Sequence, residues 1–341
     1  MQKSIIYRNV KLLGILLILA LVALLFLTLP SGLPSLYTKG NKILSASTNQ
    51  PITLRGIVSD YFRYDFNYDY PELYGGLEAE LAKIKYLKQA GADVNVVGLY
   101  LARLDKIKSH IEEMDQYIEY ARDNDMYVYL APAGIGFLET NPEKKIKKDE
   151  GYWENVGAND LGALTEFLAS RYGSYSNVMY QLTAEPNISY STWEIKQREL
   201  AEIVRKYTNN PIIVSTPRYT PYSSLPALPF ENIIYSTGGY VRRVDGSFTE
   251  RQISDILGIE SLKRIYPVMV AEFGGNYGGD FSSVEDLLSF KNIMEALHQE
   301  QLSYSVYRLS ATYQGDGLAL FDTEGNLTKK GQIFLNMFVS Y

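Results

Sequence analysis

Short apolar runs alternate with longer amphipathic segments through most of this chain, and this alternation constrains the fold more than any other feature. Eight runs of strand length span residues 52–58, 94–101, 126–131, 178–183, 211–215, 232–236, 267–273 and 303–309. Segments with helical periodicity lie at residues 78–89, 111–124, 160–171, 192–207, 249–262, 284–299 and 329–338. Strands that are apolar on both faces are typical of parallel sheets covered by helices. The pattern therefore predicts a (β/α)8 TIM barrel.

An open, doubly wound sheet is the alternative arrangement for alternating strands and helices. Such a sheet usually carries a glycine-rich phosphate-binding loop after its first strand. In this sequence Gly56 stands alone in that region. We therefore favour the closed barrel.

Residue types that are rare or missing narrow the chemistry that the chain can perform. It contains no cysteine, which excludes disulfides, thiolate metal sites, iron–sulfur clusters and cysteine nucleophiles. Its two histidines, His110 and His298, fall in helical segments, so a multi-histidine metal site is not expected. The formal charge of −6 lacks the basic excess that nucleic-acid binding requires. We expect no metal, no organic cofactor and no nucleic-acid partner.

The N-terminal part of the chain has the features of a membrane anchor. Residues 12–29 are uncharged and almost entirely Leu, Ile, Val and Ala, which is close to the minimum length for spanning a lipid bilayer. Basic residues precede this stretch, so the positive-inside rule keeps the N-terminus in the cytoplasm. The expected parts are a cytoplasmic tip with the transmembrane anchor, a linker and an extracellular (β/α)8 domain, at residues 1–30, 31–42 and 43–341. A cleaved signal peptide, which would release the domain as a secreted protein, is the alternative.

Two glutamates follow buried apolar runs, where an ionised carboxylate is costly unless a site uses it. Glu185 follows the fourth run, and Glu272 lies near the end of the seventh. The carboxyl ends of barrel strands share one face, which carries the active site in enzymes of this fold. Two carboxylates about 5–5.5 Å apart on that face would meet the geometric requirement of retaining glycoside hydrolysis. For either glutamate alone, a salt bridge to a loop arginine is the competing interpretation.

Four short motifs occur at the expected places along the predicted barrel. In chain order they are Leu54-Arg55-Gly56, Gly91-Ala92-Asp93-Val94-Asn95, Ala184-Glu185-Pro186-Asn187 and Ala271-Glu272-Phe273-Gly274. Their order and spacing resemble glycoside hydrolase family 5, the cellulase family of clan A barrels. The resemblance extends over most of the chain after the predicted linker, and it implies the (β/α)8 fold.

The resemblance also implies roles for individual residues. Glu185 matches the family's general acid/base and Glu272 its nucleophile, while Tyr240 matches the tyrosine that hydrogen-bonds the nucleophile. This chemistry requires Glu272 to be held ionised and Glu185 to start protonated. The implied activity is cofactor-free, endo-acting cleavage of a β-linked polysaccharide or oligosaccharide with retention of configuration, on a cellulose- or mannan-like substrate.

Several supporting residues of the family are replaced in this chain. Ala184 stands where the family has an asparagine before the acid/base, and Gly98 lies at or near its second-strand arginine. Gly239 replaces a histidine before the sixth-strand tyrosine. The eighth-strand tryptophan corresponds to Tyr307 or Arg308.

These replacements leave two hypotheses open. In the first, the chain is an enzyme with an altered sugar site, in which Tyr100, Arg103 or Arg308 holds a different sugar. Such an enzyme would act by hydrolysis or by transglycosylation. In the second, the barrel has lost catalysis and binds a glycan or a cell-surface partner. We favour the enzyme, because a non-catalytic barrel gains nothing from two facing carboxylates that repel each other.

Further candidates for sugar contact lie in loops after the predicted strands. Tyr61 belongs to a stretch after the first strand in which aromatic and polar residues alternate, and Trp153 lies in the third loop. Flat aromatic rings suit the faces of sugars. The predicted substrate-binding set is Tyr240, Tyr100, Tyr61, Trp153, Asn187, Tyr307 and Arg308.

Overall fold

The computed structural model describes residues 32–63, 75–101, 104–132, 158–184, 190–216, 227–241, 263–276, 283–311 and 316–339. The chain divides into two compact units, Met1–Gly32 and Leu33–Tyr341. The predicted anchor over residues 12–29 lies outside the described residues. Within the described ranges, no helix has both the length and the apolar character that crossing a bilayer requires.

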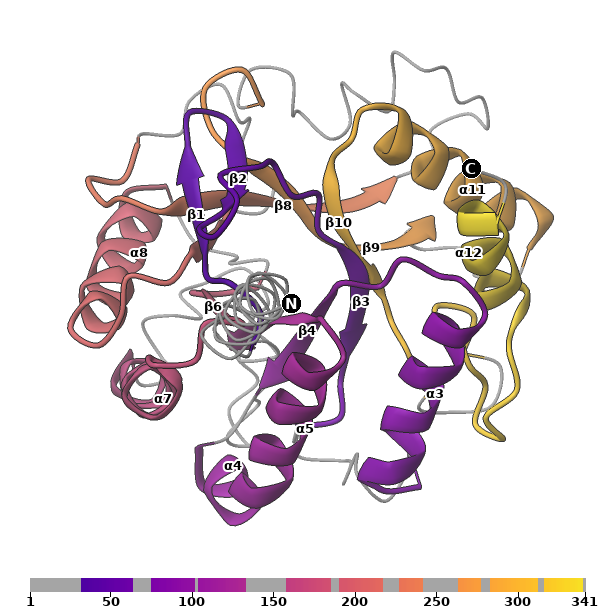
Figure 1. Ribbon diagram of the computed structural model, residues 1–341, viewed down its shortest axis with the longest axis horizontal. Coiled ribbons are helices and arrows are strands. Elements are labelled where there is room, and N and C mark those ends of the chain that lie inside the picture. The colour runs from indigo at the N-terminus through magenta and orange to yellow at the C-terminus, as the bar shows by residue number, and fades with distance from the viewer. Residues whose placement is uncertain are drawn as a thin grey trace, which may run out of the picture. The chain divides into compact units, whose positions relative to one another are not determined.

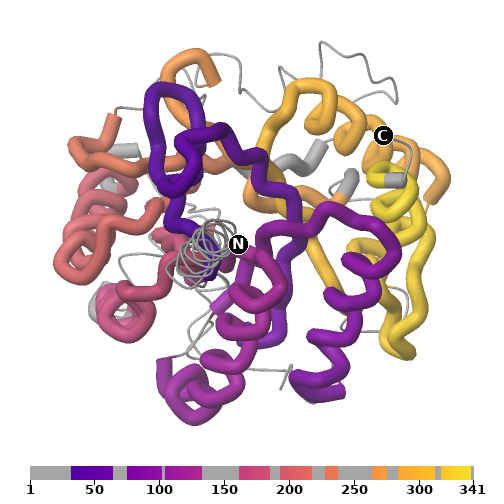
Figure 2. The backbone as a smooth tube through the Cα atoms, viewed as in Figure 1, coloured from indigo at the N-terminus to yellow at the C-terminus, as the bar shows by residue number. Residues whose placement is uncertain are grey.

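Parallel strands form a closed barrel, which confirms the predicted (β/α)8 architecture (Figure 1). Their order is β10-β3-β4-β5-β6-β7-β8-β9, so the first and last barrel strands lie side by side, as the tube in Figure 2 also shows. Each strand overlaps its predicted apolar run. The strands are β3 (Arg55–Ser59), β4 (Val96–Leu101), β5 (Tyr127–Pro132), β6 (Val178–Gln181), β7 (Ile212–Ser215), β8 (Ile233–Val241), β9 (Val268–Asn276) and β10 (Ser303–Tyr307).

Helices surround the barrel on its outer side (Figure 1). They are α3 (Leu77–Gln89), α4 (Leu104–Ser109), α5 (Ile111–Asp123), α7 (Ala158–Tyr172), α8 (Tyr190–Arg205), α11 (Val284–Gln299) and α12 (Lys329–Val339). All except the short α4 coincide with predicted helical segments, and the segment predicted over 249–262 lies outside the described residues. Ser283 caps α11, because its hydroxyl accepts a hydrogen bond from the backbone N–H of Asp286 (3.1 Å).

A two-stranded antiparallel hairpin, β1 (Leu36–Lys39) and β2 (Lys42–Ser45), precedes the barrel strands. This hairpin corrects the linker predicted over residues 31–42, because Leu36 and Ile43 are buried against side chains of the barrel interior. Side chains at or just before the starts of β5, β6 and β8 donate hydrogen bonds to backbone carbonyls of residues 33–36, from Tyr127, Ser176 and Asn232. The hairpin therefore covers the end of the barrel opposite the carboxyl ends of its strands.

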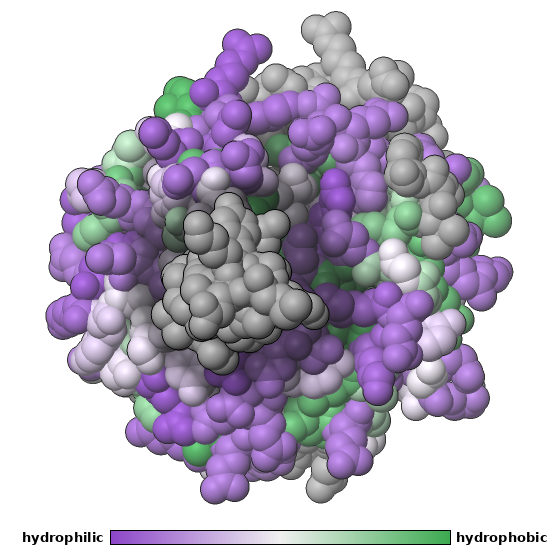
Figure 3. Space-filling view, in the orientation of Figure 1, coloured by the Kyte–Doolittle hydropathy of each residue, from purple (hydrophilic) through white to green (hydrophobic). Residues whose placement is uncertain are grey.

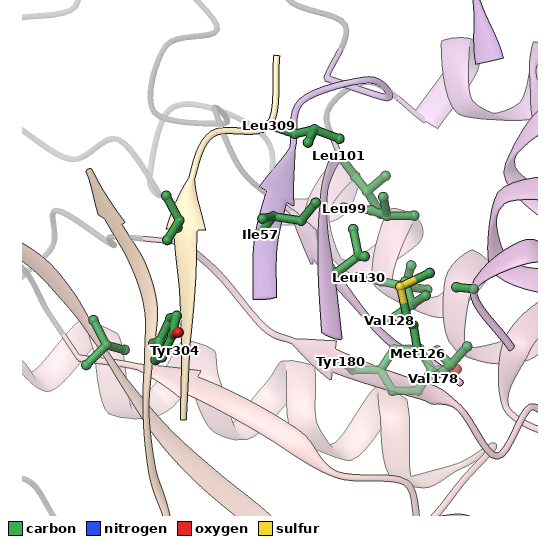
Figure 4. Close-up of a cluster of buried hydrophobic side chains, with 14 of the residues drawn as sticks. Ile57, Leu99, Leu101, Met126, Val128, Leu130, Val178, Tyr180, Tyr304 and Leu309 are labelled. Atoms are coloured by element: carbon green, nitrogen blue, oxygen red, sulfur yellow. The ribbon is translucent and has the colours of Figure 1, made fainter. Parts of the chain in front are cut away.

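The strands separate two layers of core side chains. In β5, Tyr127, Tyr129 and Ala131 belong to the cluster inside the barrel, whereas Val128 and Leu130 belong to the cluster between strands and helices. Figure 4 shows this outer cluster, in which side chains of neighbouring strands pack together. Because successive side chains of a strand point to opposite faces, nearly every strand residue is buried.

On the face shown in Figure 3, hydrophilic side chains predominate and hydrophobic ones form small, separate groups. Isolated exposed hydrophobic side chains of this kind are normal in folded proteins and need no partner to explain them.

Candidate active site

Strand β9 contains a β-bulge, which determines where Glu272 points. The pairing with β10 places one residue of β10 opposite two residues of β9, Ala271 and Glu272. The pairing with β8 shifts at the same place. Regular alternation from Met269 would turn Phe273 inward, but Phe273 packs in the outer cluster. The extra residue therefore turns Glu272 toward the barrel interior, as bulges near active sites commonly do.

Tyr100 contacts the Glu272 side chain directly. Its hydroxyl donates a hydrogen bond to Oε2 of Glu272, which is partly exposed. Tyr100 lies near the carboxyl end of β4, which is three strands away from β9 around the barrel, so this bond crosses the barrel interior. A donor to a carboxylate stabilises its charged form. The structure thus gives the Tyr100 hydroxyl a contact with the predicted nucleophile, and its predicted sugar contact stays a prediction.

Tyr129 supports the same segment of β9 from further inside the barrel. Its hydroxyl donates to the backbone carbonyl of Ala271, with an O–O distance of 2.7 Å. Its ring lies beside Gly98, the paired residue on β4, and a Cβ at that position would lie 2.1 Å from Cζ of the ring. Gly98 is the position at or near which the family's arginine is expected. The tyrosine ring therefore occupies space that any larger residue at position 98 would need.

A buried ionic cluster lies beside the carboxyl ends of β3 and β10. Arg308 contacts two carboxylates: its Nη1 lies 2.8 Å from Oδ2 of Asp60, and its Nε lies 2.9 Å from Oδ2 of Asp316. Arg63 lies 3.6 Å from the same Asp60 oxygen. Both carboxylate side chains are fully buried, and that of Arg308 is 8% exposed. Arg308 is thus paired with these two carboxylates, and its predicted contact with sugar stays a prediction.

Tyr307 connects this cluster to Tyr100. The centroids of their rings lie 5.8 Å apart, and the Tyr307 hydroxyl donates to Asp60 at 2.8 Å. Burial, followed by the Asp60 charge, raises the pKa of Tyr307 well above its ordinary value. Burial also raises the pKa of Tyr129, with a smaller contribution from the Glu272 charge. Both phenols therefore keep their protons at neutral pH and act as donors.

Tyr61 is a core residue and not a surface for sugars. It is 1% exposed, its hydroxyl donates to Glu113 of α5 at 2.8 Å, and its ring packs edge-on against Phe62. A side chain buried in this way offers no face to a substrate. Tyr61 therefore serves in packing after the first strand, which corrects the prediction that it binds substrate.

Several predicted site residues lie outside the described residues. They include Glu185, Asn187 and Trp153. The backbone of Tyr240 pairs with Gly275 at the end of β8, and nothing is described of the Tyr240 side chain. The roles of these residues, and the separation of about 5–5.5 Å between the two catalytic carboxylates, stay predictions.

In the part of the chain that the structure describes, no three His, Asp or Glu side chains gather closely enough to hold a metal ion. The expectation of a reaction without metal or organic cofactor stays a prediction.

Sequence reasoning missed some residues that surround Glu272. Tyr129 was the clearest omission, although its place on the inner face of β5 follows from the alternation of Tyr127, Val128 and Tyr129. Asp316 gives no comparable signal: it comes eight residues after its partner Arg308 and falls in neither a predicted strand nor a predicted helix.

The fold and the inward-facing glutamate place this chain among (β/α)8-barrel enzymes, whose active sites lie at the carboxyl ends of the strands. The sequence profile of "Cellulase (glycosyl hydrolase family 5)" matches residues 83–312, about two-thirds of the chain. The chain belongs to the cellulase family, glycosyl hydrolase family 5. No curated protein matched the sequence significantly.

Solved structures of cellulases share the fold at low sequence identity. Cellulase Cel5C_n has a TM-score of 0.68 at 15% identity, over 90% of this chain and 93% of that one. The catalytic domain of Thermobifida fusca endoglucanase Cel5A has a TM-score of 0.65 at 16% identity, over 89% and 97%. A GH5 cellulase from an Icelandic hot spring isolate has a TM-score of 0.65 at 18% identity, over 91% and 96%. At these identities the likeness shows the fold alone.

Proposed function

We propose that this protein is a retaining, endo-acting glycoside hydrolase for β-linked glucan, with Glu272 as nucleophile and Glu185 as general acid/base. The observation that carries the proposal is the placement of Glu272. The β-bulge turns this carboxylate into the barrel from the middle of β9, and Tyr100, near the carboxyl end of β4, donates to it. Glu185 comes four residues after the end of β6, and we propose that it lies at the carboxyl end of the barrel strands. Membership of glycosyl hydrolase family 5 supports the same assignment.

The proposed reaction proceeds in two steps. In the first, Glu272 attacks the anomeric carbon and Glu185 protonates the leaving glycosidic oxygen, so a covalent glycosyl–enzyme ester forms. In the second, Glu185, now ionised, takes a proton from water, whose oxygen attacks the anomeric carbon and releases Glu272. The Tyr100 hydroxyl favours the ionised form of Glu272 that the first step needs.

Complexes of structural neighbours support a cello-oligosaccharide as the substrate. A Thermobifida fusca endoglucanase Cel5A variant and an endocellulase from Pyrococcus horikoshii are both described in complex with cellotetraose. For this chain we propose cleavage within a β-glucan. Tyr240, Trp153 and Asn187 are proposed as sugar contacts on the strength of the sequence motifs alone.

Substitution of the two glutamates tests the proposal. Glu272→Gln and Glu185→Gln should each reduce the hydrolysis rate of cellotetraose by orders of magnitude, because each removes one half of the chemistry. Glu199→Gln, an exposed position on α8, is the matched control and should retain the wild-type rate. NMR of the first-formed product should show the configuration of the substrate. An unchanged rate in either active-site variant, or an inverted product, would refute the mechanism.

A glycan-binding barrel without catalysis is the second candidate. The replacements Ala184 and Gly98 favour it, since both alter the surroundings of the reacting carboxylates. Long incubation of the purified domain with cellotetraose separates the candidates. An enzyme yields shorter products, a transglycosidase also yields longer ones, and a binding protein returns the tetrasaccharide intact.

We also propose that residues 12–29 anchor the protein in the cell membrane, with the barrel outside the cell. The length, apolar character and preceding basic residues of this stretch support the proposal. Membrane fractionation with mass measurement of the mature protein tests it. A mature chain that lacks residues 1–30 would show cleavage of a signal peptide instead.

A further inference from the structure

The bulge residue Ala271 has a backbone carbonyl that is held by a side chain. A β-bulge leaves its extra residue unpaired in the strand ladder. Here the hydroxyl of Tyr129 donates to the Ala271 carbonyl at 2.7 Å, from β5 on the opposite side of the barrel. Tyr129 is fully buried, and its high pKa, caused chiefly by burial, keeps the phenol protonated. The bulge that turns Glu272 inward is thus fixed by a hydrogen bond through the barrel interior.

Tyr100 holds the next residue of the same bulge. It lies two residues after Gly98 on the inner face of β4, and its hydroxyl donates to the Glu272 carboxylate. The Tyr129 ring fits beside Gly98 because that residue has no side chain. The missing side chain at position 98 and the two tyrosines are therefore parts of one arrangement. The Tyr129 ring occupies the space of a side chain at position 98 and holds the strand, while the Tyr100 hydroxyl holds the Glu272 carboxylate.

We propose that Tyr129 and Tyr100 are positioning residues for the nucleophile, one fixing the bulge at Ala271 and the other fixing the carboxylate of Glu272. This inference rests on the proposed function, because it assigns Glu272 the role of nucleophile. Titratable side chains that interact with Glu272 include Tyr100 from β4, Tyr129 from β5 and Tyr307 from β10.

Removal of single hydroxyl groups tests the two roles separately. Tyr100→Phe removes the donor to the carboxylate, so kcat/KM should fall about 10- to 100-fold, as expected for a hydrogen bond to a charged group. The acid limb of its pH profile should move upward by about one unit, because the ionised form of Glu272 loses a donor. Tyr129→Phe leaves the carboxylate contact in place, so kcat should fall roughly tenfold at nearly unchanged KM, with the acid limb as in wild type.

Tyr127→Phe is the matched control. Tyr127 lies two residues before Tyr129 on the same inner face of β5, and its hydroxyl also donates to a backbone carbonyl, that of Pro34, at 2.8 Å. This bond lies at the opposite end of the barrel, so its loss should leave kcat within about twofold of wild type. Gly98→Ala is a second test variant. Its Cβ would displace the Tyr129 ring, so this variant should reproduce the kcat loss of Tyr129→Phe.

A measurement without substrate separates this inference from the proposed function. The carboxyl group of Glu272 is titrated by carbon-13 NMR in wild type and in Tyr100→Phe, with Glu272→Gln to identify its signal. A raised pKa of Glu272 in Tyr100→Phe supports the proposal, even if the wild-type barrel cleaves no glycan and the proposed function fails. An unchanged titration in Tyr100→Phe overturns the proposal. A kcat in Tyr129→Phe equal to that of Tyr127→Phe, in an active enzyme, also overturns it.

Discussion

The side chain of Arg308 has two possible roles, and substitution distinguishes them. As a sugar ligand, it would contribute to substrate binding and little to stability. As the cation between Asp60 and Asp316, it neutralises two fully buried carboxylates. Loss of one partner from a buried ion pair leaves an uncompensated charge in the interior. We predict that Arg308→Met destabilises the barrel.

The magnitude depends on which carboxylate loses its partner. Asp60 keeps the Tyr307 hydroxyl at 2.8 Å and Arg63 at 3.6 Å. Asp316 keeps a backbone N–H at 3.2 Å but loses the guanidinium, so most of the penalty falls there. Removing one partner of a buried pair costs about 3–5 kcal/mol. In a domain of this size that corresponds to a fall in Tm of roughly 5–8 °C.

Thermal unfolding followed by near-ultraviolet circular dichroism measures this effect. Arg308→Met combined with Asp316→Asn should recover more than half of the lost Tm, because the second substitution removes the stranded charge. Arg198→Met is the control, since its ion pair with Glu194 on α8 is exposed and contributes little. A Tm within about 2 °C of wild type, together with a strongly raised KM, would refute the buried-pair interpretation.

Three further predictions concern the helices around the barrel. Lys330→Met should cost about 3–5 kcal/mol in urea unfolding, because Lys330 and Asp286 form a 2.7 Å ion pair that is almost completely buried; a loss below 1 kcal/mol would contradict this. Burial opposes the ionisation of Asp115, but hydrogen bonds from Arg171 and Tyr172, together with the Arg171 charge, outweigh it and lower the pKa of Asp115. Stability should therefore fall as pH drops below the unfolded value of about 3.9. Asp115→Asn should show a smaller fall over that pH range in a series of urea titrations. Ser283→Ala should lose about 1 kcal/mol by removing the cap of α11, and an unchanged midpoint would count against the cap.

The barrel itself was predictable because its signal is repeated along the chain. Each barrel strand overlaps an apolar run, and a continuous run such as Val96–Leu101 is what burial on both faces requires. The hairpin was missed although a signal was present. Gly40 and Asn41 form a two-residue turn between Leu36–Lys39 and Lys42–Ser45, and Gly40 adopts a φ of +58° there. The surrounding Pro, Gly and Ser residues favoured a linker over this short pattern.

The sequence pattern predicts Glu272 as a site residue, but it does not predict the backbone geometry that turns this side chain inward. Glu272 was predicted from its place near the end of an apolar run, yet regular alternation from Met269 would put it on the outer face. A one-residue bulge does not change the pattern of an apolar run, so only the structure shows its effect on Glu272. The prediction that Tyr61 binds substrate was wrong for a related reason. An aromatic residue after a strand can face either the core or solvent, and its partner Glu113 lies far away in the sequence.

The central claim is that Glu272 becomes covalently bonded to the sugar during turnover. Incubation with an activated 2-deoxy-2-fluoro cellobioside slows the second step and allows the glycosyl–enzyme to accumulate. Intact mass followed by peptide mapping should find one added disaccharide, attached to the peptide that contains Glu272, and none in Glu272→Gln. An unlabelled protein that still hydrolyses cellotetraose, or a label on another side chain, would contradict the claim.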